Sequence, residues 1–140
     1  MNKLIVLIIA LILTGCVFTG PTKFYSGPEM PASELSGIKC GNFIIVKAID
    51  GKEVNNRKQF CDIAILPGAH TITYQYYRSM PNSPDYAINL AKHKVRFYTR
   101  KGHSYMLAAS YPDGKYLFWL FEKTADGKST NRKVKYSVLK

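Results

Sequence analysis

The sequence predicts an all-β fold, a small antiparallel β-sandwich of about seven strands over residues 28–140. Short stretches rich in Val, Ile, Tyr and Phe alternate with polar residues, as is typical of strands with one buried face. Turn signals containing Gly, Pro, Asn or Asp recur about every ten residues between these stretches. The segment has the usual size of one domain, so it is long enough to bury a single core.

The first elements of the domain follow a flexible stretch. Residues 17–27 are rich in Gly, Thr, Pro and Ser and are predicted to form a tether. A single helical turn is predicted around residues 31–35. Residues 43–49 are apolar except for Lys47 and form the first predicted strand. Asp50-Gly51 directly afterwards provides the residues that a tight hairpin turn favours.

The next predicted strand covers residues 59–65. Leu66-Pro67-Gly68-Ala69 follows and fits a type II turn, because Pro sets φ at the second position and Gly accepts a positive φ at the third. This turn predicts a hairpin in which Ile63 faces Ile72 of the returning strand.

The second half of the chain contains further strands separated by turns. Residues 78–85 hold two prolines and are predicted to be a loop. Turns are predicted at Lys101-Gly102, at Asp113-Gly114 and in residues 125–128. Counting outward from Asp113-Gly114 places Tyr111 opposite Tyr116, a favourable cross-strand pair. The strands themselves are predicted over residues 86–100 (long and bent), 104–110, 116–123 and a closing strand through Val134, Tyr136 and Val138.

The first fifteen residues are predicted to be a signal peptide that is removed from the mature chain. A positive start at Lys3 precedes an unbroken apolar run over residues 4–13. A helix of that length rises only about 15 Å, half of the ~30 Å hydrocarbon core. A stable transmembrane span is therefore the poorer interpretation.

The end of this segment, Leu13-Thr14-Gly15-Cys16, resembles the lipobox of bacterial lipoproteins. The resemblance implies that Cys16 is acylated, for example with palmitate, and becomes the first residue of the mature protein. Several acyl chains on one residue form a firm membrane anchor, whereas a single chain binds only marginally. Because Val17 rather than Asp follows the cysteine, the resemblance favours the outer membrane. The alternative is an ordinary secreted protein with a chance cysteine near its cleavage site.

The formal net charge of +11 bears on partners rather than on fold. Nucleic acid is the usual partner of a basic domain, but an exported lipoprotein does not meet it. We expect a membrane anchor and anionic envelope components instead, namely lipopolysaccharide, anionic lipid or peptidoglycan, or an envelope protein.

Cys40 and Cys61 remain once Cys16 carries lipid, and we predict a disulfide between them. The periplasm allows disulfides to form and persist. Cys61 would face Tyr74 in the predicted hairpin and point toward the core, and Cys40 shares the alternation of Ile44 in the preceding strand. Two separate buried thiols are the alternative.

The sequence contains no signature of catalysis or of a cofactor. His70, His93 and His103 lack the spacing of helical metal ligands, and the two remaining cysteines do not form a CxxC. A zinc site made by the three histidines stays open as a minor alternative. His70 follows the Pro-Gly turn and is predicted to bond nearby backbone. We therefore expect a protein that is not an enzyme, with no metal and no cofactor.

One stretch carries a pattern that predicts binding. Every second residue from position 92 to 100 is basic or aromatic, and the residues between them from 95 to 99 are apolar or Thr. A strand here would bury the second set and direct the first outward. This outward set, the basic ladder, consists of Lys92, Lys94, Arg96, Tyr98 and Arg100 and is predicted to bind an anionic ligand. Lys133 and Lys135 repeat the spacing. The alternative is a solvated face or an edge strand protected by Lys.

Two turn motifs resemble PEGA-type β modules. Ile49-Asp50-Gly51-Lys52 matches their IDGK turn, and Leu66-Pro67-Gly68-Ala69-His70-Thr71 matches the LPGxHT turn that follows. Together with residues 25–31 they also resemble a loose group of small, largely uncharacterised bacterial lipoproteins. The chain lacks the Pro-Glu-Gly-Ala stretch and adds a cysteine pair. The resemblance covers residues 25–77 and implies a β fold and an envelope location, without an activity.

These observations predict an outer-membrane or periplasm-facing lipoprotein that binds or attaches structurally at the cell envelope through a basic β face. The alternative is a lipoprotein that binds and neutralises a specific protein, as immunity proteins and enzyme inhibitors do. A basic chain would need an acidic target for that role.

Overall fold

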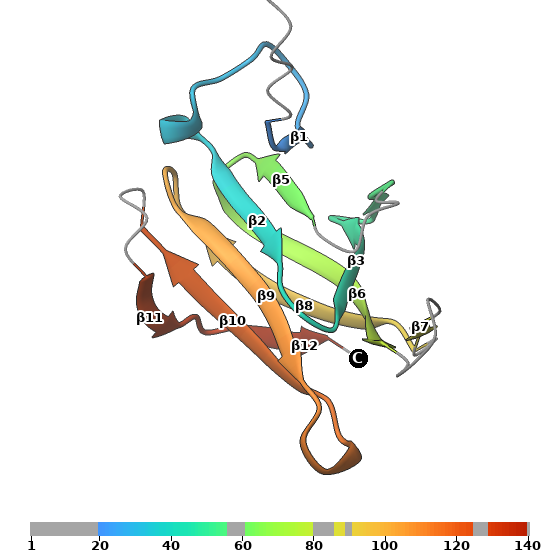
Figure 1. Cartoon of the computed structure of the whole chain (residues 1–140). Helices are drawn as coiled ribbons and strands as arrows, with labels where there is room; N and C mark the ends of the chain where they lie inside the picture. The colour runs from blue at the N-terminus through green and yellow to red at the C-terminus, as the bar shows by residue number, and fades with distance from the viewer. Residues whose placement is uncertain (1–19, 56–60, 80–85, 89–90, 125–128, 140) are drawn as a thin grey trace, which may run out of the picture.

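The computed structural model describes residues 20–55, 61–79, 86–88, 91–124 and 129–139. They form two β-sheets packed face to face, as Figure 1 shows, so the predicted all-β sandwich is confirmed. The predicted signal peptide, Cys16, the start of the second predicted strand at residue 59 and the predicted turn at residues 125–128 lie outside the described residues.

The first sheet has six strands and mixes parallel with antiparallel pairs. Strand β1 runs parallel to β5, and β2 runs parallel to β9, whereas the other neighbours are antiparallel. The spatial order is β1 (Thr22–Lys23), β5 (Asp62–Ile65), β2 (Ser36–Cys40), β9 (Ser104–Ser110), β10 (Leu117–Lys123) and β11 (Ser129–Lys133).

The second sheet is entirely antiparallel. Its order is β12 (Ser137–Leu139), β8 (His93–Thr99), β6 (Gly68–Ser79), β3 (Ile44–Ile49) and β4 (Lys52–Glu53), and β7 (Tyr86–Ile88) also pairs with β6. Two short 3₁₀ helices accompany the sheets, at Ala32–Glu34 and Pro112–Gly114. The first lies within the predicted helical turn at residues 31–35.

The core lies between the two sheets and is filled by the inward side chains of both. Ile38, Ile63 and Leu107 come from the first sheet and are fully buried. Ile44, Ile72 and Val95 from the second sheet are fully buried as well. Burial of one such side chain contributes about 1.5–3 kcal/mol, so this layer supplies the main drive for folding. In the described part of the chain, no helix is long and apolar enough to cross a membrane.

Two predicted hairpin turns are present. Asp50 and Gly51 have φ values of 50° and 80° and connect β3 to β4. Positive φ at both positions is what a type I′ turn requires, and Asp and Gly accept it at low cost. The second turn is Asp113-Gly114. On either side of it the ring centroids of Tyr111 and Tyr116 lie 4.4 Å apart, which confirms the predicted pair.

The predicted hairpin at Leu66-Pro67-Gly68-Ala69 is wrong. Strand β5 before it belongs to the first sheet and β6 after it to the second, so the chain crosses between the sheets at this corner. Ile63 therefore pairs with Ile38, and Ile72 pairs with Ile49 and Val95. Both isoleucines still point into the same core, because each sheet presents its apolar face to the other.

Several further predictions differ from the structure. The strand predicted over residues 86–100 is divided into β7 and β8. In the predicted closing strand, residues 134–136 form no strand and link β11 of the first sheet to β12 of the second, which contains Val138. Part of the predicted tether, residues 17–27, is a strand in the structure, because Thr22 and Lys23 pair with β5 and form β1. The described residues form twelve strands instead of about seven, several of only two or three residues, and two of the pairings are parallel.

Candidate functional site

Strand β8 presents the basic ladder as the alternation predicts. Val95, Phe97 and Thr99 are buried, whereas Lys94, Arg96 and Tyr98 are exposed, as is Lys92 just before the strand. Among the described residues, no carboxylate forms an ion pair with Lys92, Lys94 or Arg96. Three cations of the ladder therefore face solvent without a compensating charge.

Lys133 and Lys135 extend the positive surface beyond β8. They lie where the chain passes from β11 of the first sheet to β12 of the second. Two adjoining hollows in this region form what we call the basic groove. One is lined by Tyr98, Arg100, Tyr105, Glu122, Lys133, Val134 and Lys135, and the other by Arg96, Lys133, Val134, Lys135, Tyr136 and Ser137. The Nζ atom of Lys133, however, lies 4.4 Å from the centre of the Trp119 ring on β10, so Lys135 is the cation that the crossing segment adds beside Arg96.

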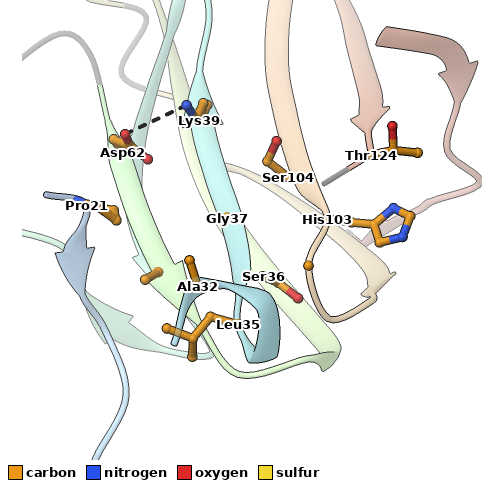
Figure 2. A pocket seen from close by; sticks show the side chains of 12 residues that line it. Pro21, Ala32, Leu35, Ser36, Gly37, Lys39, Asp62, His103, Ser104 and Thr124 are labelled. Atoms are coloured by element: carbon orange, nitrogen blue, oxygen red, sulfur yellow. Dashed lines mark ion pairs between the residues drawn. The ribbon is translucent and has the colours of Figure 1, made fainter. Parts of the chain in front are cut away.

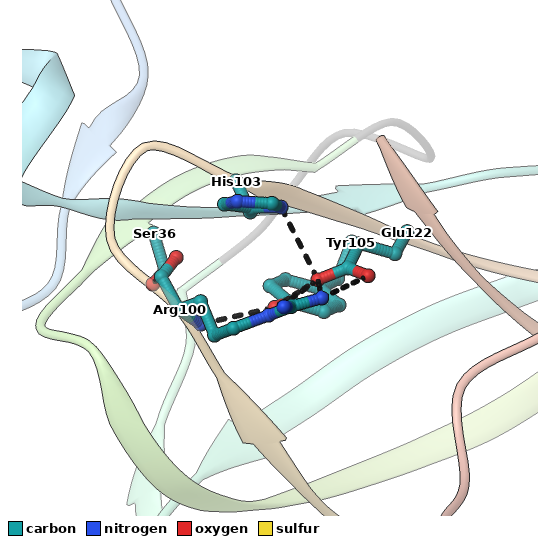
Figure 3. Close-up of polar contacts among 5 residues, drawn as sticks. All are labelled: Ser36, Arg100, His103, Tyr105 and Glu122. Carbon is teal, nitrogen blue, oxygen red and sulfur yellow. Dashed lines mark hydrogen bonds and ion pairs between the residues drawn. The ribbon is translucent and has the colours of Figure 1, made fainter. Parts of the chain in front are cut away.

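Arg100 differs from the other ladder residues because its guanidinium binds a carboxylate. Its Nη2 donates hydrogen bonds of 2.7 and 2.6 Å to Oε1 and Oε2 of Glu122, and its Nε donates one of 3.1 Å to Oε1. Figure 3 shows that the Tyr105 hydroxyl reaches the same carboxylate, at 2.8 Å from Oε1. The Glu122 side chain is 5% exposed and that of Arg100 is 52% exposed. Arg100 is therefore exposed, as the predicted ladder requires, but its charge is already paired with Glu122.

Neighbouring groups fix this pair at the turn between β8 and β9. The backbone N–H of Arg100 donates to the Tyr105 hydroxyl at 2.9 Å, and the Ser36 hydroxyl donates to the Arg100 carbonyl at 2.8 Å. His103 Nδ1 lies 3.2 Å from Glu122 Oε1, although the geometry is not that of a hydrogen bond. The cluster holds the turn by which the chain crosses from the second sheet to the first.

The protonation states follow from these contacts. Burial alone would raise the pKa of Glu122, but the hydrogen bonds from Arg100 and Tyr105 and the charge of Arg100 outweigh it, so this pKa is lowered. The hydrogen bond to Glu122 raises the pKa of Arg100, and burial raises the pKa of Tyr105. None of the three is adjusted to exchange a proton near neutral pH, so the cluster fits a fixed ion pair better than a general acid or base.

His70 bonds nearby backbone as predicted and also joins the two motifs that resemble PEGA-type modules. Its Nε2 lies 2.8 Å from the Leu66 carbonyl oxygen, and its Nδ1 lies 2.6 Å from Asp50 Oδ2. The other oxygen of Asp50 accepts a 2.8 Å hydrogen bond from the backbone N–H of Thr71. These contacts connect the β3–β4 turn to the start of β6, which is a structural role.

The other two histidines do not lie with His70. His93 packs against Tyr74 and Tyr76, with ring centroids 5.5 and 4.9 Å apart, and His103 belongs to the Glu122 cluster. Across the residues that the structure describes, no group of three His, Cys, Asp or Glu side chains could hold a metal ion. The alternative of a zinc site made by three histidines therefore has no geometric support here.

The predicted disulfide between Cys40 and Cys61 is present. Their Cα atoms are 4.9 Å apart, and both residues are buried. The bond joins the end of β2 to the residue before β5, two strands that are antiparallel neighbours. The predicted contact between Cys61 and Tyr74 does not form as a strand pair, because Tyr74 lies in the other sheet.

A separate cavity of about 330 Å³ opens beside β2, β5 and β9, as seen in Figure 2. Gly37 borders it, and a Cβ atom there would lie 3.1 Å from the Cβ of Ser104. Lys39 and Asp62 also border it and neutralise each other at a distance of 3.8 Å. The other lining residues are Pro21, Ala32, Leu35, Ser36, Ala64, Gly102, His103 and Thr124. No residue of the basic ladder reaches this cavity.

The chain matches no protein-family model, no curated protein and no solved structure. The resemblance to PEGA-type modules stays a prediction from two turn motifs.

Proposed function

We propose that this protein is an outer-membrane or periplasm-facing lipoprotein whose β domain binds anionic groups of the cell envelope. The observation that carries the proposal is the gathering of exposed cations at one place. Lys94 and Arg96 stand on β8, and the crossing segment adds Lys135 beside them. No carboxylate of the described residues forms an ion pair with any of these three side chains.

The spacing of these cations lets them act together. Alternate residues of a strand lie about 6.6 Å apart, which is shorter than the screening length of about 8 Å at physiological ionic strength. Like charges held this close repel each other in the free protein, and a bound anion reduces this repulsion. The groove between β8 and the crossing segment concentrates this field on one side of the domain.

Anchoring through Cys16 would make weak contacts sufficient. An acylated Cys16 keeps the domain beside the membrane, so binding to nearby phosphates or carboxylates becomes effectively intramolecular. The predicted partners are lipopolysaccharide, anionic lipid and peptidoglycan. Binding by exposed charges must weaken as salt rises.

The direct experiment measures binding without the lipid anchor. A chain that starts at residue 16 and carries Cys16→Ser keeps all described residues, and circular dichroism and thermal unfolding check that it folds. We expect it to sediment with anionic vesicles, lipopolysaccharide or isolated peptidoglycan at low salt and to be released by raised salt. Absence of binding to all three would contradict the proposal. If crosslinked envelopes then yield one dominant acidic protein, the inhibitor alternative replaces it.

A further inference from the structure

Exposed apolar side chains gather beside the basic ladder. Seven large hydrophobic residues are exposed in the described part of the chain, and four of these lie on β8 or in residues 136–139. Tyr98 is 66% exposed and Val138 is 69% exposed, the two highest values of the set. Tyr136 and Leu139 are 39% and 38% exposed. A purely solvated basic face gives no reason for this concentration.

The pairing of β12 with β8 places these groups among the cations. Ser137 lies opposite Arg96, Val138 opposite Val95 and Leu139 opposite Lys94, and Figure 1 shows the two strands side by side. Residues directly opposite each other share a face, so Leu139 stands next to Lys94 on the outer face. Tyr98 occupies the same face two positions beyond Arg96. Val138 shares the inward side of Val95, but β12 is the last strand of its sheet and leaves it uncovered.

This mixture fits a lipid surface better than a charged polymer. The exposed side chains of Tyr98 and Leu139 on this face contribute nothing to the binding of a carboxylate polymer by charge. At the interface of a bilayer they leave water, and a tyrosine suits the same depth because its ring is apolar and its hydroxyl stays wet. Lys and Arg can lay their aliphatic stems on the surface and direct their charged ends to lipid phosphates.

We propose that the outer face of β8 and β12 docks on an anionic lipid bilayer, with Tyr98 and Leu139 entering the interface and Lys94, Arg96 and Lys135 contacting phosphates. The inference rests on the proposed function and narrows its anionic partner to membrane lipid. Binding then has two components. Attraction between charges weakens with salt, whereas burial of the apolar groups persists.

The first test removes the apolar groups and keeps every cation. The unlipidated chain with Cys16→Ser is compared with the same chain carrying Tyr98→Ser and Leu139→Ser. The ligands are vesicles of phosphatidylglycerol and phosphatidylethanolamine, and isolated peptidoglycan. We expect the double variant to bind vesicles at least about tenfold more weakly and peptidoglycan unchanged. The matched control carries Leu66→Ser and Leu117→Ser, which are 42% and 45% exposed away from this face, and should bind vesicles normally.

The second test reports insertion directly. The chain has a single tryptophan, Trp119, so Trp119→Phe with Tyr98→Trp moves the fluorophore to the face in question. Vesicles should shift its emission to shorter wavelength, and brominated lipid should quench it. If the protein sediments with vesicles but its tryptophan emission neither shifts nor is quenched, the inference is overturned. The proposed binding by charge alone would then stand. Loss of all vesicle and polymer binding would overturn the proposed function as well. A dimer that Val138→Ser dissociates, without vesicle binding, would assign β12 to self-association instead.

Discussion

Replacing Glu122 with Gln keeps the shape of this side chain and removes the charge that Arg100 and Tyr105 bind. The wild-type carboxylate is 5% exposed and accepts hydrogen bonds of 2.6–3.1 Å from both residues. Hydrogen bonds to charged groups contribute about 1.5–3 kcal/mol each to stability. Water replaces part of this loss for Arg100, whose side chain is 52% exposed, and the amide oxygen of Gln still accepts one bond. We expect Glu122→Gln to lower the free energy of unfolding by about 2–3 kcal/mol.

The effect should depend on pH in a defined direction. The folded-state pKa of Glu122 is lowered, because the hydrogen bonds and charge of Arg100 outweigh the effect of burial. The ion pair therefore stabilises the fold fully above the ordinary glutamate pKa of about 4.3 and is lost as pH falls through the lowered value. The Gln side chain does not titrate in this range. The difference between the two proteins should be full at pH 7 and should shrink as the pH falls below about 4.

Urea unfolding of the chain with Cys16→Ser, with and without Glu122→Gln, measures this difference at each pH. The thermal midpoint should fall by roughly 10 °C at neutral pH for a domain of this size. Glu53→Gln is the control, since Glu53 is exposed on β4 and should change stability little. A loss below about 0.5 kcal/mol at pH 7, or an equal loss at all pH values, would refute the role assigned to the ion pair.

Three further predictions test the anchor, the disulfide and the motif contacts. Cys16→Ala should abolish labelling with palmitate and leave an uncleaved precursor, and equal labelling of the variant would contradict the predicted anchor. The bond between Cys40 and Cys61 spans 21 residues, so the chain-entropy model predicts that Cys40→Ala lowers the free energy of unfolding by about 3 kcal/mol. Two free thiols titrated in the oxidised, unfolded protein would disprove the bond. Asp50→Ala removes the contacts to His70 and Thr71. It also places alanine, which has no polar side chain to bond the local backbone, at a φ of 50°. We expect the free energy of unfolding in urea to fall by about 1–2 kcal/mol. Asp50→Asn should cost less, and an equal cost would argue against these contacts.

The alternation of residues predicted which side chains are buried but not which sheet contains them. Residues 93–99 bury every second side chain as predicted, and the Asp50-Gly51 turn forms where its residues require. The corner at Pro67 and the turn at Gly102 join strands of different sheets. Both sheets face one core, so a hairpin and a crossing between sheets bury the same residues. The two parallel pairings also have no local signal, because they join segments far apart in sequence.

The partner of Arg100 was missed for the same reason, because alternation does not predict which distant segments lie together. Its place in the alternation that continues from β8 predicts an outward cation, and the local sequence holds no acid nearby. Glu122, however, lies on the inward face of β10, the same face that carries the partly buried Phe118 and the buried Leu120. An acid on an inward position requires a cationic partner, and this signal could have predicted an ion pair. Lys135 could not be placed beside Arg96 from sequence, because the crossing from β11 to β12 is a long-range feature.

The binding of anionic envelope groups by the basic ladder is tested most directly by two charge-reversal variants that have the same net charge. One variant carries Lys94→Glu and Arg96→Glu, and the control carries Lys52→Glu and Lys115→Glu, exposed residues on β4 and beyond β9. Both lose the same total charge, and neither should change stability much.

The measurement is the dissociation constant for anionic vesicles at low salt. Each basic residue at an anionic surface contributes about 1 kcal/mol, so removal of two predicts binding at least roughly 30-fold weaker, and repulsion by the two added carboxylates weakens it further. The control should stay close to wild type. An equal loss of affinity in both variants would show that net charge alone explains binding and would contradict a specific role for the ladder.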